Sequence, residues 1–275
     1  MSQSAQQDQH IEPGPALNPT VPNPARIWNY WVGGKDNFPA DRLVAESVNE
    51  LVPTLPLTAR SARRFLADVV NRTSAAGVRQ FLDIGTGLPT ADNTHQVAQR
   101  AVPESRIVYV DHDPVVLAHA RALLTSSPEG KTDYIDADLR DPAKILAAAG
   151  QTLDFTQPVV ILLIAILHFV PDSDDPYGVV STLLAAMPSG SYLALAHAAG
   201  DIDAEANSEG ARRYNASAAA AQFTLRDRRQ VARFFDGLEL APPGLVPLNR
   251  WWQADTTDSL EAADLAAYCG LGRKP

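Results

Sequence analysis

Three acidic residues follow short apolar runs and have the chemistry to bind a nucleoside. Asp83 and Asp111 are the last residues of two such runs, and Asp138 lies just beyond a third. A carboxylate offers two acceptor oxygens at the spacing of the vicinal hydroxyls of a ribose, which favours Asp111 as a ribose ligand. Asp138 is placed to accept a hydrogen bond from the exocyclic amine of an adenine. For Asp111 and Asp138 taken singly, capping of a strand or helix end is the alternative.

Two glycines follow the first acid within the segment Phe81–Thr90. A strand that ends in Asp83 and turns through Gly85 and Gly87 lets the backbone approach a ligand closely. A short Gly-x-Gly is weak by itself, and an ordinary tight turn is the alternative. Three acids at the ends of successive strands strengthen the case, because ligands bind at the carboxyl edge of a parallel sheet.

Five β-rich runs that alternate with helical segments must position these residues. Such alternation predicts a parallel sheet with helices on both faces. The run Val159–Ile164 is continuously apolar, which is typical of a central strand covered on both faces. Asp-Pro pairs predict three helix starts, since aspartate caps a helix and proline suits its first position. The runs are Val78–Asp83, Arg106–Asp111, Thr132–Asp136, Val159–Ile164 and Ser191–His197, and the pairs are Asp113-Pro114, Asp141-Pro142 and Asp175-Pro176.

The flanking segments differ in composition from this alternating region. Residues 1–24 contain five prolines and no Lys or Arg, which predicts a flexible arm. Residues 25–77 carry an aromatic stretch and an amphipathic helix, so we expect an N-terminal helical extension that covers the cofactor site. Residues 78–275 form the main domain, with a helical insertion near 198–222 as a lid. The final run, Ala266–Arg273, is expected to be an antiparallel strand.

Composition excludes several classes of protein. The chain has 275 residues, a formal net charge of −9 and a pI near 5.1, which argues against a broad nucleic-acid-binding surface. The single cysteine, Cys269, has no partner for an internal disulfide, and no Cys/His spacing suggests a metal site. The longest apolar run, Val159–Leu167, is too short to cross a bilayer. We expect a cytoplasmic protein without nucleic-acid or membrane partners, whose oligomeric state the sequence leaves open.

From about Val78 onwards, this arrangement resembles the class I S-adenosylmethionine-dependent methyltransferases. The resemblance implies an α/β fold with a doubly wound, mostly parallel, seven-stranded Rossmann-like sheet and an antiparallel C-terminal element. It implies S-adenosylmethionine as cofactor and S-adenosylhomocysteine as product. The first-strand acid and glycines would line the amino-acid end of the cofactor, the second acid the ribose and the third the adenine. The cofactor residues so implied are Asp83, Gly85, Gly87, Asp111, His112, Asp138, Leu139 and Ala165.

The N-terminal segment Tyr30–Phe38 is similar to the signature Tyr-x-x-Gly-Gly-Lys-Asp-Asn-Phe of an actinobacterial subfamily of these enzymes. The likeness extends to Asn93–His95, Leu167–Asp172, Phe235–Glu239 and Tyr268–Pro275, so it covers nearly all of the chain after Ala25. It names no substrate.

One departure from the methyltransferase pattern concerns the third glycine of the loop, which is replaced near Leu88-Pro89. The amino-acid end of the cofactor is therefore expected to be held differently. The segment around Gly33 offers a compensation, in which Lys35 or Asn37 meets the methionine carboxylate. Tyr30 or Trp31 would cover the sulfonium. A purely structural N-terminal clamp is the alternative.

Two residues are candidates for acid–base catalysis. His168 follows the presumed fourth strand and has a side chain suited to a general base near neutral pH. Tyr214, in the predicted insertion, is the second candidate. A packed histidine satisfied by backbone is the alternative for His168. Arg60, Arg63 and Arg64 have the charge to steer an anionic substrate, but a solvated helix face is favoured.

The sequence thus predicts a methyltransferase that acts on a small molecule. A non-catalytic sensor or partner protein that binds the same cofactor is one alternative. A nicotinamide-dependent oxidoreductase is another, because Gly85-x-Gly87 and a downstream acid also fit a dinucleotide fold. Against it, that fold has no evident use for Asp83 or Asp138, and Thr90 stands where its fingerprint requires a small residue.

Overall fold

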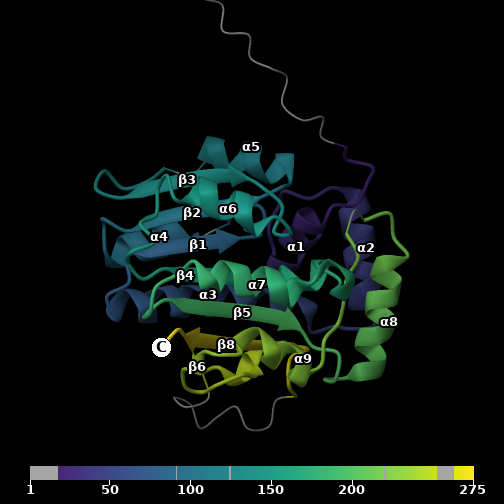
Figure 1. The fold of residues 1–275 in the computed structure, drawn as a ribbon. Helices are drawn as coiled ribbons and strands as arrows, with labels where there is room; N and C mark the ends of the chain where they lie inside the picture. Colours follow the sequence, from purple (N-terminus) through teal and green to yellow (C-terminus); the bar gives the residue numbers. More distant parts are fainter. Residues whose placement is uncertain (1–17, 91, 124, 220, 253–262) are drawn as a thin grey trace, which may run out of the picture.

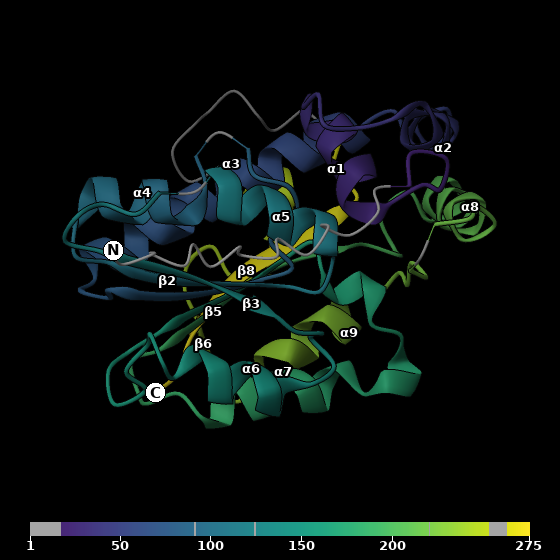
Figure 2. The ribbon, with the colours of Figure 1, turned by 90° about the horizontal axis from the view of Figure 1, so that it is seen from above.

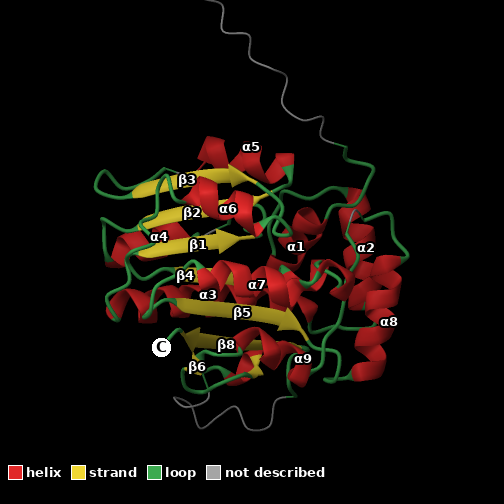
Figure 3. Ribbon diagram, viewed as in Figure 1, coloured by secondary structure: helices red, strands yellow, loops and turns green. Residues whose placement is uncertain are grey.

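In a computed structural model of the chain, residues 18–90, 92–123, 125–219, 221–252 and 263–275 are described, and most of the predicted arm, residues 1–24, lies outside them. Eight strands in the described residues form one sheet in the order β3-β2-β1-β4-β5-β8-β6, with β7 also pairing with β8 (Figures 1 and 3). They are β1 Gln80–Ile84, β2 Arg106–Asp111, β3 Lys131–Asp136, β4 Val160–Ile164, β5 Tyr192–Ala198, β6 Glu239–Leu240, β7 Val246–Pro247 and β8 Ala267–Arg273.

The sheet confirms the predicted parallel core. Strands β1 to β5 are parallel, and β8 runs antiparallel to β5. The apolar strand β4 lies between β1 and β5, at the centre of the order. The strand count differs from the seven expected, because the segment around Pro242-Pro243 forms two strands of two residues each along β8.

Helices cover both faces of the sheet (Figure 2). Alternate residues of each strand point to opposite faces, so Leu82 and Ile84 join one buried cluster while Phe81 joins the other. The first cluster packs against α6 Pro142–Ala149, α7 Pro176–Ala185 and η3 Arg233–Phe235, beside α9 Arg228–Ala232. The second packs against α3 Leu55–Ala75, α4 Thr94–Ala101 and η4 Leu248–Arg250, and α5 Pro114–Leu123 lies on the same side.

The three Asp-Pro pairs begin helices as predicted. The carboxylates of Asp113, Asp141 and Asp175 accept backbone N–H groups of the first turns of α5, α6 and α7 at 2.8, 3.0 and 3.1 Å. Each proline occupies the first position of its helix. Local side-chain chemistry therefore fixes where these three helices start.

Three further helices lie beyond the carboxyl ends of the parallel strands (Figure 1): α1 Pro24–Val32, α2 Pro39–Asn49 and α8 Ala204–Asn215. A fully buried ion pair, Arg26 Nε to Asp41 Oδ2 at 2.8 Å, joins α1 to α2. Gly210 of α8 packs against Val48 of α2, where a β-carbon would be crowded. These helices are thus tied together as a cover over one edge of the sheet. Among the described residues, no helix combines the length and apolarity needed to span a membrane.

Candidate functional site

A cavity of about 400 Å³ lies at the carboxyl ends of β1, β2, β4 and β5, beneath α1, α3 and α8. Its size is within the range of about 300–1,000 Å³ typical of small-molecule sites. Its lining is mostly apolar, with a few polar groups that converge on it. From the strand ends these lining residues are Asp83, Gly85, Thr86, Gly87, Asp111, His112, Ile164, Ala165, Ile166, His168, Phe169, Ala196, His197 and Ala198.

Asp83 is a buried carboxyl at the end of β1. Its side chain accepts a hydrogen bond from the Thr94 hydroxyl at 2.6 Å. Burial raises the pKa of Asp83 to about 6, against the opposing effects of the Thr94 hydrogen bond and the Arg63 charge. A buried carboxyl that ionises with difficulty would gain from a cationic ligand group beside it.

The raised pKa of Asp83 makes the stability of the protein depend on pH. The folded state favours the protonated carboxyl, so this group's contribution is complete below about pH 4, declines as pH rises, and is lost above about pH 6. Asparagine does not titrate, so it avoids this loss. We therefore expect the unfolding free energy of Asp83→Asn to rise by about 3 kcal/mol relative to that of the native protein as the pH increases from 4 to 7. Urea unfolding of both proteins across this range measures the difference. Parallel pH profiles would contradict the assignment.

Asp111 and the glycines form the adjoining part of the cavity. The Asp111 carboxylate accepts the Gly87 N–H at 3.1 Å and the Asp113 N–H at 2.9 Å, and burial raises its pKa. Gly85 has φ of 74°, and a β-carbon there would collide with the Ile166 side chain. Gly87 has φ of 63°. The turn therefore requires glycine at 85 for conformation and for space.

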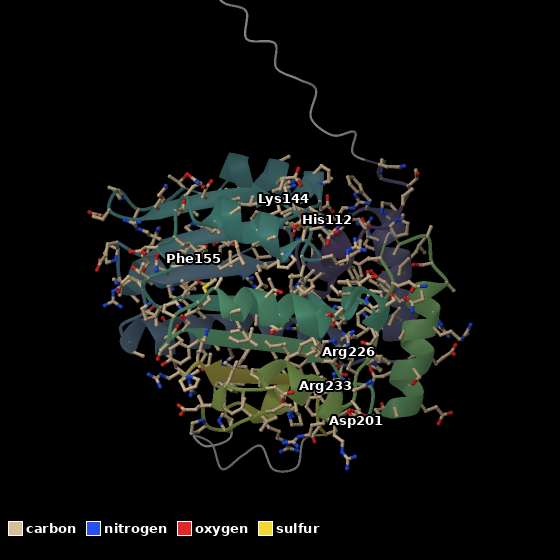
Figure 4. The ribbon with its side chains drawn as sticks, viewed as in Figure 1. His112, Lys144, Phe155, Asp201, Arg226 and Arg233 are labelled. Atoms are coloured by element: carbon tan, nitrogen blue, oxygen red, sulfur yellow. The ribbon has the colours of Figure 1, made fainter. Side chains whose placement is uncertain are left out.

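Ala165 and His112 complete this part of the lining. Ala165 follows β4 with φ of 60°, a conformation uncommon for residues other than glycine, and its N–H donates to the Ala196 carbonyl at 2.9 Å. His112 is exposed at the mouth of the cavity. Figure 4 shows His112 and Arg226 at the sheet edge that faces α1 and α8, on either side of the central strands.

Asp138 and Leu139 are outside the cavity lining. Asp138 is engaged by Arg140, whose Nε donates to its carboxylate at 2.9 Å and whose Nη2 forms an ion pair with it at 2.5 Å. This partner lowers the pKa of Asp138. Leu139 is buried in the apolar cluster on one face of the sheet. The structure therefore does not bring this pair together with Asp83 and Asp111, and their role at the adenine stays a prediction.

The aromatic N-terminal segment is divided between the cavity and the α1–α2 turn. Trp28 and Trp31 line the cavity, whereas Tyr30, Gly33, Lys35 and Asn37 do not. The Tyr30 hydroxyl hydrogen-bonds Glu46 at 3.0 Å. Asn37 donates to the Asn29 side chain and the Gly34 carbonyl, each at 3.0 Å, while Gly33 ends α1 with φ of 91° and Lys35 is exposed. These contacts build a turn, as the structural-clamp alternative expects, so the cofactor roles of these four residues stay predictions.

Arg63 is a cavity residue for which the sequence analysis favoured a solvated helix face. It projects from α3 and lines the cavity together with Asp83, and the two charges interact. Its Nη2 donates to the Asp92 carbonyl at 2.9 Å. On a helical wheel of α3, Arg63 lies next to buried Ala59 and Leu66 and to exposed Arg60, so it stands at the border of the buried face. Only the approach of the β1 loop makes it part of a site.

At the other end of the cavity lie His168 and Tyr214. These residues are 4 % and 3 % exposed, and neither His168 Nδ1 nor the Tyr214 hydroxyl has a hydrogen-bond partner among the residues that the structure describes. Burial lowers the pKa of His168 well below its usual value and raises that of Tyr214 above its own. Unpaired buried polar atoms are costly, and both residues line the cavity.

The strand order and the site define a class of protein. The parallel strands follow the order 3-2-1-4-5, and an antiparallel strand lies beside β5. The cavity lies over the ends of β1 and β2, which carry Asp83 and Asp111. This is a Rossmann-like methyltransferase fold. The plantazolicin methyltransferase BamL, solved with S-adenosylhomocysteine, shares this fold at a TM-score of 0.50 and 11% identity over 91% of this chain and 95% of its own. A family model described as S-adenosyl methyltransferase matches residues 10–275. The chain belongs to this family, and its cofactor is S-adenosylmethionine.

Two solved structures are similar over almost the whole chain. A DUF574 family protein from Streptomyces avermitilis is 44% identical with a TM-score of 0.87, covering 93% of this chain and 98% of its own. A Thermobifida fusca protein, provisionally assigned as a methyltransferase, is 35% identical with a TM-score of 0.84, covering 93% and 96%. No curated protein matches the sequence.

Proposed function

We propose that this protein transfers the methyl group of S-adenosylmethionine to a small molecule held in the same cavity. The observation that carries the proposal is the cavity itself, whose lining joins Asp83 and Asp111 to the unpaired His168 and Tyr214. One end thus has groups that suit the cofactor, and the other has unsatisfied groups that suit an acceptor. The enclosure by α1, α3 and α8 favours a small acceptor over a polymer.

The residues at the strand ends fit the cofactor. Asp111 has the position and charge to accept both ribose hydroxyls, and the Gly85–Gly87 turn brings backbone close to the ligand. Asp83 suits the cofactor's ammonium group, which would restore its ionised form. Arg63 replaces Lys35 and Asn37 as our candidate for the carboxylate, because it lines the cavity and they do not.

The chemistry requires mainly alignment. When bound, S-adenosylmethionine supplies a methyl group on a positively charged sulfur. Trp28 and Trp31 expose indole rings to the cavity, and an indole face attracts such a cation by up to about 2 kcal/mol when water is excluded. Burial and the nearby His197 and Arg226 lower the pKa of His168, so this side chain is neutral and a weak base, and the acceptor's proton would move to it only as the methyl group is transferred. Tyr214 orients the acceptor through its hydroxyl.

We expect Arg63→Gln to weaken S-adenosylhomocysteine binding about tenfold, because it removes a charge-assisted contact to the carboxylate. Arg60→Gln is the matched control, since Arg60 lies on the same helix and is exposed. Isothermal titration calorimetry on both variants measures the change. Equal affinities for the Arg63 and Arg60 variants would refute this placement.

The proposal as a whole is tested by binding and turnover together. Calorimetry with S-adenosylhomocysteine and with NAD separates a methyltransferase from an oxidoreductase, and we expect binding of the former alone. Turnover is followed as S-adenosylhomocysteine formed from S-adenosylmethionine in small-molecule extracts. Binding without any turnover in such extracts would favour a sensor. The actinobacterial subfamily with the Tyr30–Phe38 signature and the cytoplasmic location remain predictions.

A further inference from the structure

Four aromatic rings pack against one another and line the acceptor end of the cavity. The ring of His168 lies 4.4 Å from that of Phe223, and Phe169 lies 5.7 Å from Phe223 and 6.1 Å from Tyr214, measured between centroids. All four side chains line the cavity. We call His168, Phe169, Tyr214 and Phe223 the aromatic wall. Such a surface favours a planar, apolar ligand that stacks on it or meets it edge to face.

The hydrogen-bonding groups of the aromatic wall favour a hydroxyl on that ligand. His168 Nδ1 and the Tyr214 hydroxyl are both buried, and neither has a partner within the described part of the chain. A hydroxyl both donates and accepts, so it satisfies His168 Nδ1 whichever ring nitrogen carries the proton, and it also pairs with Tyr214. A purely apolar ligand would leave both buried atoms unpaired, at a cost to affinity.

The charges behind the wall favour a neutral ligand. Arg226, 1 % exposed, donates from Nη2 to Asp172 at 2.7 Å, and from Nη1 to His197 Nε2 at 2.8 Å and to the Leu167 carbonyl at 3.0 Å. Asp172 pairs with this charge, which nevertheless contributes to the lowered pKa of His168. His197 donates from Nδ1 to the Ala198 carbonyl at 2.8 Å, and burial lowers the pKa of His197 to about 3. An anionic ligand would therefore lose its hydration without meeting an unpaired cation among these residues.

We propose that the methyl acceptor is a neutral, planar aromatic compound that carries a hydroxyl group, held on the aromatic wall with that hydroxyl between His168 and Tyr214. This inference rests on the proposed function. Methylation would form a bond between the hydroxyl oxygen and the methyl carbon, break the bond from methyl to sulfur with its electron pair staying on sulfur, and leave the proton on His168. The positive charge moves from the sulfonium to the imidazole, so the net charge of the site is the same before and after the transfer.

Three probes of similar size separate the features of this proposal. 2-Naphthol is planar, neutral and hydroxylated, decahydro-2-naphthol lacks the aromatic face, and 2-naphthoate carries a charge. Calorimetry on the protein saturated with S-adenosylhomocysteine is expected to show 2-naphthol binding at least about tenfold more tightly than either analogue. Equal or weaker binding of 2-naphthol would overturn the inference. Failure to bind S-adenosylhomocysteine would overturn the proposed function as well, so the two failures are distinguishable.

Two variants locate the probe on the wall. Phe223→Ala is expected to weaken 2-naphthol binding about fivefold. Phe155→Ala, the same change at a half-buried site at the opposite end of the strands (Figure 4), is expected to leave it unchanged. Tyr214→Phe keeps the ring and removes only the hydroxyl, and it should weaken 2-naphthol about fivefold while leaving S-adenosylhomocysteine binding intact. Unchanged 2-naphthol affinity in both Phe223→Ala and Tyr214→Phe would place the ligand elsewhere.

Discussion

Replacing Asp111 with asparagine is expected to weaken S-adenosylhomocysteine binding about 100-fold, because two hydrogen bonds to the ribose lose their charged acceptor. The expected effect on stability has the opposite sign. Burial raises the pKa of Asp111, so the free protein holds this charge at a cost that asparagine removes. We therefore expect unchanged or higher stability with much weaker binding. Calorimetry and urea unfolding of the same preparation measure the two effects.

The matched control for this variant is Asp136→Asn. Asp136 lies opposite Asp111 in the register of β3 against β2, also at the end of its strand, but it is exposed and outside the cavity lining. Its substitution should leave S-adenosylhomocysteine affinity within about twofold. If the two variants lost affinity equally, the charge of the sheet edge rather than a contact from Asp111 would explain binding.

The second large effect is expected for His168→Phe, which keeps a ring against Phe169 and Phe223 and removes both nitrogens. We expect turnover to fall about 100-fold or more through the loss of general-base assistance. S-adenosylhomocysteine affinity should change less than about threefold, because the cofactor end of the cavity is untouched. Turnover is measured as S-adenosylhomocysteine release with 2-naphthol or small-molecule extracts.

His119→Phe is the control for this change. His119 lies in α5, where its Nδ1 meets the Val115 carbonyl at 2.9 Å, and it is outside the cavity lining. Its turnover should equal that of the native protein. Native turnover in the His168 variant would assign His168 to packing, and a collapse of stability without a specific loss of turnover would lead to the same conclusion.

The sequence predicts the parallel sheet and its helix starts because these depend on local patterns. The apolar run defines β4 itself, and each Asp-Pro pair fixes the start of the helix that follows it, α5, α6 or α7. Both signals involve only residues a few positions apart in the chain. The two-residue strands β6 and β7 leave no such pattern, since pairing with β8 alone defines them. This is why the strand count differs from the expectation.

Individual site residues are harder to predict, because their partners come from distant parts of the chain. Asp83 and Asp111 share a cavity because β1 and β2 are neighbours, which the strand pattern implies. Asp138 has the same sequence context, but Arg140 two residues further on occupies its carboxylate. Arg63 reaches the site only through the packing of α3 beside the β1 loop. Helical spacing places Arg63 at the border of the buried face but does not show which segment it meets.

The central claim is that Asp83 and Asp111 hold the cofactor in the cavity that ends at His168 and Tyr214. A crystal structure with S-adenosylhomocysteine tests it most directly. We predict the ribose hydroxyls within hydrogen-bonding distance of Asp111 and the sulfur directed toward the aromatic wall. S-adenosylhomocysteine bound outside this cavity, or bound in it with Asp111 away from the ribose, would contradict the account.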